Sequence, residues 1–336
     1  MTIDHPFAGR RTRVLGMSEV RGLIDMRAAI DVQRSAFLSL ARGTTAAAPN
    51  SWLRLPGERR GWLKLLAGYD GTEGGLGVKI LARFPENPPG ANLGSLLLLF
   101  DPDNGFPLAI MDGVYVTALR TGAGAGLATE ALARPDGARI GLVGTGVVAW
   151  YSLLAMTTMR SSWEDLRVYS RSETRRIQFC ERASSELGLR SAPVASIEEA
   201  VAGADVIVTA TNSPEPVLLA QHVRPGVHIN AMGIRTEIAP DVTAQCLVVG
   251  DGRDETLHDG KFSVALASGA VAEDDLGPDL GALLDGAELP GDAGRVTMFD
   301  SSGVAIQDVT VARYVWERAE AQQVGVLVDL GLEGAP

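Results

Sequence analysis

The sequence is poor in the residue types that build disulfide and metal frameworks. Among its 336 residues there are only two cysteines, Cys180 and Cys246, and only four histidines. The cysteines lie far apart in the chain, and the histidines show no metal-ligand spacing. We therefore expect buried, inert thiols and no metal, with His228, which begins an apolar run, packed in the interior.

Long uninterrupted apolar runs and an excess of positive charge are also lacking. Residues 140–156 are apolar, but the run contains a glycine turn and is too short to span a bilayer comfortably. The first twelve residues lack the apolar core of a signal peptide, so we expect a cytoplasmic protein with no membrane partner. A net charge of −11 argues against nucleic acid as a partner, and an anionic substrate would need a local basic site.

The sequence does contain a glycine turn between an apolar strand and an apolar helix-compatible run. The turn is Gly144-Thr145-Gly146, and the run is 147–159. With Ala149, the pattern is G-x-G-x-x-A: the first glycine permits the turn, the second lets a pyrophosphate approach, and the small third residue allows close packing. In a chain with 39 glycines this spacing alone is weak evidence, and an ordinary strand–helix turn without a ligand is the alternative.

The flanks of the turn strengthen the dinucleotide-binding interpretation. A second strand is expected at 166–171, at the distance of the ribose-reading position, and a third at 206–211. A helix over 173–187 follows the second strand, where Ser170 and Glu173 have capping-box spacing. Strands alternating with helices predict a parallel sheet with α/β architecture.

The two ends of the chain have a different pattern. After helical patterning at 28–41 comes a small-residue linker at 43–49 and then short strands at 62–66, 77–84, 93–100 and 107–111. A helix rich in alanine and glycine is expected at 117–132. An amphipathic helix at 304–323 should return to the first half, which makes that domain discontinuous.

Several motifs along almost the whole chain resemble the ornithine cyclodeaminase/mu-crystallin family. Their number and order make the resemblance specific. The motifs are Leu23-Ile24-Asp25-Met26, Gly77-Val78-Lys79, Pro85-Glu86-Asn87, Gly105-Phe106-Pro107-Leu108-Ala109, Thr117-Ala118-Leu119-Arg120-Thr121, the Gly144 turn, Thr209-Ala210-Thr211-Asn212-Ser213-Pro214, His228-Ile229-Asn230-Ala231 and Ser302-Gly303-Val304-Ala305-Ile306-Gln307-Asp308.

This resemblance implies an α/β fold with a Rossmann dinucleotide-binding domain and a discontinuous α/β substrate and dimerisation domain. We place the Rossmann domain at 117–303, and the second domain at 1–116 with 304–336. The family also implies a homodimer formed through the second domain, a nicotinamide cofactor, and chemistry on a small carboxylate-bearing amino, imino or keto acid.

Three basic residues are candidates for the catalytic site. Arg120 matches the family arginine that binds the substrate carboxylate, and a planar guanidinium can form two charge-assisted hydrogen bonds to it. Lys79 lies between apolar residues of an expected strand, where a buried lysine is costly without a function, and in the family it touches the substrate. Arg54 resembles a second carboxylate-binding arginine, although Arg59 and Arg60 lie nearby. Lys64 is a weaker competitor for Lys79.

The cofactor preference is predicted from the end of the second strand. An acidic residue there would select NAD(H), whereas Arg171 suits the 2′-phosphate of NADP(H), so NADP(H) is preferred and NAD(H) stays possible. Arg175 or Arg176 could add charge. The expected cofactor-binding residues are Gly144, Thr145, Gly146, Val147, Val148, Ser170, Arg171, Ser172, Thr211, Asn212, Ser213 and Thr121.

One departure from the family pattern bears on the reaction. Family cyclodeaminases carry an aspartate shortly after the Asn-Ala-x-Gly stretch, but the matching segment here, 230–237, is shorter and has no acid in that place. Its Glu237 resembles a later family glutamate. Arg235 in the same segment offers a second positive group, for a dicarboxylic substrate, or is a surface arginine.

The leading hypothesis is therefore a reductase or dehydrogenase for a small α-imino or α-keto acid. The basic residues would fix the carboxylate, and Lys79 or a bound water would supply the proton. Two further hypotheses stay open. One is an ornithine cyclodeaminase, converting ornithine to proline and ammonia, or a related amino-acid synthase. The other is an NADPH or small-molecule binding protein of the mu-crystallin type.

Overall fold

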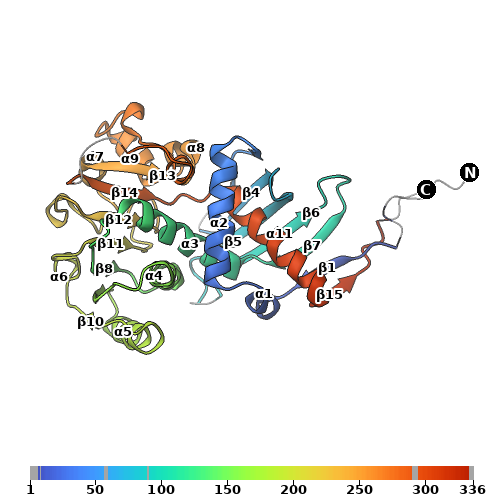
Figure 1. Cartoon of the computed structure of the whole chain (residues 1–336), viewed down its shortest axis with the longest axis horizontal. Coiled ribbons are helices and arrows are strands. Elements are labelled where there is room, and N and C mark those ends of the chain that lie inside the picture. Colours follow the sequence, from blue (N-terminus) through green and yellow to red (C-terminus); the bar gives the residue numbers. More distant parts are fainter. Residues whose placement is uncertain (1–6, 8, 57–59, 89–90, 290–293, 333–336) are drawn as a thin grey trace, which may run out of the picture. The chain divides into compact units, whose positions relative to one another are not determined.

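The computed structural model describes residues 7, 9–56, 60–88, 91–289 and 294–332. The chain forms two compact units. Unit 1 comprises residues 1–117 with 305–336, and unit 2 comprises residues 118–304. Figure 1 shows both, coloured along the chain.

Unit 1 is an eight-stranded sheet with helices on one face (Figure 1). The strand order is β15-β1-β7-β6-β5-β4-β2, with β3 paired to β4, and all pairs are antiparallel except β1 with β7. Its elements are β1 Thr12–Leu15, α1 Met17–Leu23, α2 Met26–Ala41, β2 Thr45–Ala47, β3 Ser51–Arg54, β4 Trp62–Asp70, β5 Gly75–Arg83, β6 Leu93–Phe100, β7 Pro107–Asp112, α11 Ala305–Gln322 and β15 Val326–Val328.

Alternation along the strands of unit 1 sets its core. In β4 and β5 every second residue is buried and its neighbours are partly exposed, as expected for a sheet covered on one face. The covering element is α11, which packs on β4, β5 and β6 and against α2. The prediction of a linker at 43–49 is wrong in part. The segment contains β2, because Thr45–Ala47 pairs with the end of β4.

Unit 2 is a seven-stranded parallel sheet with the order β10-β9-β8-β11-β12-β14-β13. Its elements are α3 Val114–Leu132 (whose first turn belongs to unit 1), β8 Arg139–Val143, α4 Val147–Met159, β9 Asp165–Tyr169, α5 Glu173–Leu187, β10 Ser191–Pro193, α6 Ile197–Val201, β11 Val206–Thr209, β12 His228–Ala231, α7 Pro240–Gln245, β13 Cys246–Gly250, α8 Arg253–His258, α9 Lys261–Ser268, α10 Leu280–Leu284 and β14 Val296–Asp300, with single 3₁₀ turns at Ala220–His222 and Glu273–Asp275.

The topology of unit 2 fixes where a ligand can bind. The chain runs outward from β8 through β9 to β10, then returns to place β11 on the other side of β8. In such sheets ligands bind at the carboxyl ends of the strands, at this reversal of direction. The predicted Rossmann-type fold is confirmed. The sequence did not indicate β14, which lies between β12 and β13.

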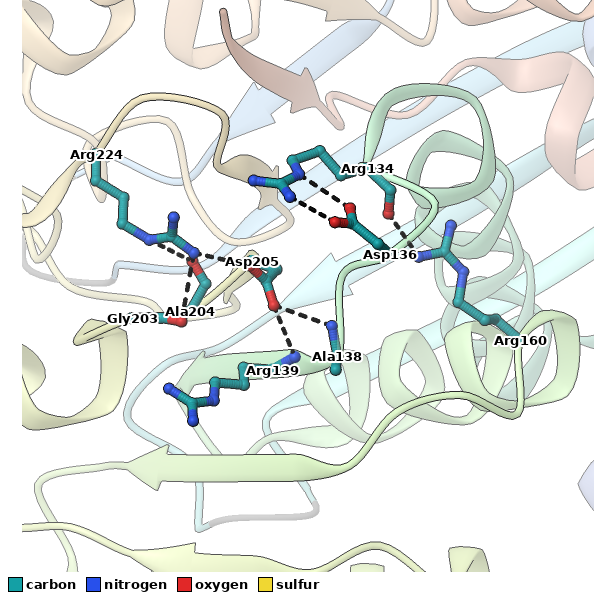
Figure 2. A network of polar contacts seen from close by, with 9 residues as sticks. All are labelled: Arg134, Asp136, Ala138, Arg139, Arg160, Gly203, Ala204, Asp205 and Arg224. Atoms are coloured by element: carbon teal, nitrogen blue, oxygen red, sulfur yellow. Dashed lines mark hydrogen bonds and ion pairs between the residues drawn. The ribbon is translucent and has the colours of Figure 1, made fainter. Parts of the chain in front are cut away.

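The opposite, amino-terminal edge of this sheet is held by a network of ionic contacts (Figure 2). Asp205 Oδ2 accepts hydrogen bonds from the backbone N–H groups of Ala138 and Arg139, at 2.9 and 3.1 Å. Its Oδ1 accepts from Arg224 at 2.8 Å. Burial opposes ionisation of Asp205, but these hydrogen bonds outweigh it and lower its pKa. The network therefore joins the starts of β8 and β11.

A second polar chain crosses the interior of unit 2. His228, fully buried, lies 3.0 Å from Thr297 Oγ1 and 3.3 Å from Asn230 Oδ1. Asn230 in turn donates to Thr129 Oγ1 at 2.7 Å. Burial lowers the pKa of His228 to about 4, with the nearby charge of Arg160 acting in the same direction and the Asn230 hydrogen bond opposing it. The predicted packing of His228 is confirmed, as a neutral imidazole.

Candidate active site

The glycine turn lies at the carboxyl end of β8, where unit 2 reverses direction. Gly144 has φ +110°, and a Cβ at this position would lie 2.5 Å from the backbone oxygen of Ala210. Only glycine fits there, because both the backbone conformation and the neighbouring loop exclude a side chain. Gly146 is the N-cap of α4 and has no capping side chain, and Val147 is 61% exposed. The first turn of α4 thus leaves backbone N–H groups without a side-chain cap, and such groups can bind a phosphate.

The end of β9 carries the residues expected to read the ribose. Arg171 is exposed, and the described part of the chain gives its guanidinium no hydrogen-bond or ion-pair partner. The predicted cap of α5 is wrong: the N-cap is Ser172 and not Ser170. The Oγ of Ser172 accepts a hydrogen bond from Arg175 N at 3.4 Å. Arg176 donates to the Ser170 carbonyl at 3.1 Å, so it is held against the strand end.

A buried carboxylate fixes the next two loops of this edge. Glu237 is fully buried and accepts from Thr209 Oγ1, Thr211 N, Thr211 Oγ1 and Gly233 N at 2.6–2.9 Å. Burial raises its pKa, while Lys261 and these hydrogen bonds act in the opposite direction. The loop after β11, with Thr211, Asn212 and Ser213, is therefore joined to the loop after β12.

Arg120 lies beneath the loop that follows β14. It is only 6% exposed, and a Cβ on Gly303 (φ +84°) would lie 3.0 Å from Arg120 Nη2. Asp251, fully buried, holds this loop by accepting from Gly303 N at 2.6 Å and from Ser302 Oγ at 2.7 Å. The glycine leaves room for the guanidinium against the backbone. Thr121, the next residue of α3, is likewise buried.

Behind this loop lies a buried ion pair. Lys261 Nζ donates to the Ser301 carbonyl at 3.0 Å and is 3.5 Å from Asp300 Oδ1. Burial raises the pKa of Asp300, and Lys261 opposes that shift. The pair therefore anchors the end of β14, in addition to the contacts of Asp251 with the loop.

In unit 1, Lys79 is one of the most buried side chains. It is 1% exposed, and its Nζ lies 2.6 Å from Oδ2 of Asp308 on α11, which is 0% exposed. The ion pair compensates both charges, because an isolated buried ammonium would be far more costly. Sequence reasoning missed Asp308 as a partner, although an acid inside the buried stripe of an amphipathic helix was the available signal.

The strand register places further basic residues on the same face as Lys79. Lys79 pairs with Leu66, Lys64 with Trp52, and Arg54 with Trp62, so these side chains share one face of the sheet. The Trp52 ring lies 5.2 Å from the Arg54 guanidinium and 4.7 Å from Lys64 Nζ. Arg54 is exposed, whereas Lys64 is 7% exposed. Arg59, named as a competitor, lies outside the described residues.

The structure therefore groups the site residues by unit. Unit 1 brings Arg54 and Lys79 to one sheet face. The residues gathered at the carboxyl edge of unit 2 are the Gly144 turn with Val147 and Val148, the Ser170–Ser172 segment, the Thr211–Ser213 loop and Arg120 with Thr121. Of the residues that hold this edge from within, the sequence singled out Glu237 only as resembling a family glutamate, and it did not single out Asp251 or Lys261.

A family model matches residues 10–323, and its description is ornithine cyclodeaminase/mu-crystallin family. The chain belongs to this family. An alanine dehydrogenase of Archaeoglobus fulgidus is 33% identical over 94% of this chain and 97% of its own. None of the helices in the described part of the chain combines the length and apolar character of a membrane span.

Two solved structures superpose closely on most of the chain. The Δ1-pyrroline-2-carboxylate reductase of Thermococcus litoralis, in complex with NADH and L-proline, has a TM-score of 0.90 at 30% identity, covering 94% of this chain and 100% of its own. The iminosuccinate reductase of Paracoccus denitrificans, in complex with NAD⁺, has a TM-score of 0.87 at 30% identity, covering 96% and 100%.

Proposed function

We propose that the protein is a nicotinamide-dependent oxidoreductase that reduces a small α-imino or α-keto acid. The observation that carries the proposal is the dinucleotide-type glycine turn of unit 2, which shares its sheet edge with the buried Arg120; unit 1 contributes a second buried cation, Lys79. Buried charged groups of this kind cluster at functional sites. Relatives with 30–33% identity that are named as an alanine dehydrogenase, a Δ1-pyrroline-2-carboxylate reductase and an iminosuccinate reductase support this reaction class.

The residues at the carboxyl edge of unit 2 fit a dinucleotide. The missing side chain at Gly144 and the uncapped start of α4 suit a pyrophosphate, and the Thr211–Ser213 loop is fixed by Glu237. When bound, the nicotinamide supplies the hydride for the α-carbon. The role of this part of the chain is to hold the cofactor without rearrangement during the reaction.

We assign the substrate carboxylate to Arg120, with Arg54 as a second contact. Arg120 is held against the Gly303 backbone, so its guanidinium is oriented before the substrate arrives. Lys79 would contact the reacting group and donate a proton from Nζ to the imine nitrogen or keto oxygen as hydride arrives. Asp308, 2.6 Å from Nζ, orients the ammonium group.

The cofactor preference that we propose is NADP(H), with NAD(H) also accepted. Arg171 is exposed and has no partner in the described residues, so it can meet a 2′-phosphate without losing another contact. Arg175, exposed in the first turn of α5, can add charge, whereas Arg176 is held by the Ser170 carbonyl.

Unit 1 is proposed to form a homodimer through the sheet face opposite α11. A row of apolar side chains crosses that face in register: Val14, Ile110, Leu98 and Val78, all partly exposed. The neighbouring Leu96 is 50% exposed. A contiguous row of exposed apolar side chains is a feature of interfaces between subunits. Light scattering should give twice the chain mass, and Leu96→Lys combined with Val78→Lys should weaken association.

The cyclodeaminase alternative is disfavoured by the position of Glu237. It is the single acid of segment 230–237, but it is fully buried and bound to loop donors, so it is not available for substrate amines. Formation of proline and ammonia from ornithine, without net cofactor consumption, would favour the alternative. Tight NADPH binding, with no turnover of any substrate, would favour a mu-crystallin-type binding protein.

The decisive experiment follows NADPH and NADH oxidation by the purified full chain. The substrates are Δ1-pyrroline-2-carboxylate, and pyruvate with ammonia. We expect turnover, and a fall of about 100-fold or more in kcat for Lys79→Met, the size typical of a lost general acid. Lys64→Met is the matched variant, because Lys64 is the other buried lysine of that face. NADPH fluorescence titration shows whether each variant is folded.

Two outcomes would contradict these assignments. If Lys64→Met abolished turnover and Lys79→Met did not, the proton donor would be Lys64 and not Lys79. If the folded wild type oxidised neither cofactor with any of these substrates, the reductase proposal itself would be wrong.

A further inference from the structure

The loop after β12 carries a cation that the proposed reaction does not yet use. Arg235 is exposed, and within the described residues its guanidinium has no hydrogen-bond or ion-pair partner. It lies in segment 233–236, at the carboxyl end of β12. The chain as a whole carries −11, so an anionic ligand at this edge would depend on local cations such as Arg235.

The loop is firmly attached, although its arginine is exposed. Ile234 N donates to the Thr211 carbonyl at 3.0 Å, and Thr236 Oγ1 donates to the Ser213 carbonyl at 2.9 Å. Gly233 N donates to the buried Glu237 at 2.6 Å. The backbone on both sides of Arg235 is therefore fixed to the loop that we assign to the cofactor. A loop of this kind can hold a charge in a defined place.

The sheet order places this loop beside Arg120. Strand β12 is paired with β14, and the guanidinium of Arg120 packs on Gly303, which follows β14. Neighbouring strands are about 4.8 Å apart, so the loops after β12 and β14 lie next to each other at the same edge. The guanidinium of Arg120 is buried against the backbone of the second loop, whereas Arg235 in the first loop is exposed.

We propose that Arg235 binds a second carboxylate, so that the preferred substrate is a dicarboxylic imino or keto acid. This inference rests on the proposed function and adds a substrate class to it. Arg120 would bind the carboxylate next to the reacting carbon, and Arg235 the distal one. A guanidinium suits this role, because it offers two parallel donors to a carboxylate and is always charged.

The test compares two keto acids of equal chain length, oxaloacetate and 2-oxobutyrate, each with ammonia and NADPH. Ammonia condenses with the keto acid, releasing water, and the imine gains a hydride and a proton to give the amino acid. For Arg235→Ala we expect kcat/KM to fall about 10- to 100-fold with oxaloacetate and less than about twofold with 2-oxobutyrate. Arg235→Lys should recover part of the loss, because it keeps the charge.

The matched control is Arg190→Ala. Arg190 is also exposed, with its side chain 74% accessible, but it precedes β10 at the opposite edge of the sheet. The Arg190→Ala substitution should leave kcat/KM unchanged with both substrates. Equal losses on both substrates with Arg235→Ala, or no loss on either, would overturn the inference while leaving the reductase proposal intact.

A binding measurement covers the case in which the wild type turns over neither keto acid. Calorimetric titration of the NADP⁺-loaded protein with succinate and with butyrate should show tighter binding of succinate, and Arg235→Ala should remove the difference. Equal binding of the two acids by the wild type would refute the second carboxylate site even without turnover.

Discussion

The buried imidazole of His228 predicts a specific loss of stability in mild acid. Its pKa is about 4 in the folded protein, against an ordinary value of 6.5. Between these values the unfolded chain binds a proton that the folded chain does not, so the free energy of unfolding falls as the pH falls. The contribution is complete above pH 6.5 and is lost progressively down to about pH 4.

The magnitude follows from the size of the shift. The difference of 2.5, from 6.5 down to about 4, corresponds to about 3 kcal/mol in all, at about 1.4 kcal/mol per pKa unit. Between pH 7 and pH 5 the same shift gives about 2 kcal/mol. The ring is fully buried, so solvent does not screen the penalty.

The assay is urea unfolding of wild type and His228→Gln at pH 7 and pH 5. Glutamine keeps a donor and an acceptor for Thr297 and Asn230, but it does not titrate. We expect the wild type to lose about 2 kcal/mol more than the variant between the two pH values. Other acid-sensitive groups, Asp205 among them, are common to both proteins and cancel. Parallel pH dependence of the two proteins would refute the reasoning.

Three further predictions concern the sheet edges of unit 2. Gly144→Ala should weaken NADPH binding at least about 10-fold and cost about 1–3 kcal/mol of stability, because its Cβ would meet the Ala210 carbonyl at φ +110°; fluorescence titration and urea unfolding measure both. Arg171→Asp should weaken NADPH binding about 10- to 100-fold but NADH binding only slightly, in parallel titrations; equal losses would contradict the assignment. Asp205→Asn should destabilise the protein at pH 7; because the folded-state pKa of Asp205 lies below its ordinary value of 3.8, this deficit should shrink only as the pH falls below 3.8 and the wild-type carboxylate becomes protonated.

Local signals in the sequence predicted most of the elements near the site. The glycine turn, the helix 147–159 and the helix 173–187 depend on residues close in the chain, and the structure has both helices with the same bounds. The strand 93–100, a short apolar run, was also predicted with correct bounds. The apolar pattern predicts these elements because each of them either buries one face or is buried on all sides.

The elements that were missed are stabilised by distant partners. Strand β14 gains its place between β12 and β13 from two parallel ladders, and nothing in its own short sequence indicates them. The three-residue β2 exists because β4 is long enough to pair with it. The N-cap of α5 shifted from Ser170 to Ser172 because both serines could cap, and only the backbone geometry decides between them.

The buried acids of unit 2 explain how a strongly acidic protein can build a basic site. Glu237 and Asp251 are both fully buried, and both accept hydrogen bonds from backbone N–H groups of the loops at the carboxyl edge. Their carboxylates are directed at the backbone of these loops and away from solvent, whereas Arg171 and Arg235 are exposed on the same edge. Because the loops are fixed by the acids, the guanidinium groups need little reorganisation to meet an anion, and such preorganisation is the main source of electrostatic stabilisation in enzymes. The net charge of the chain is therefore a poor guide to the charge of the ligand. The positions of a few buried carboxylates are a better one.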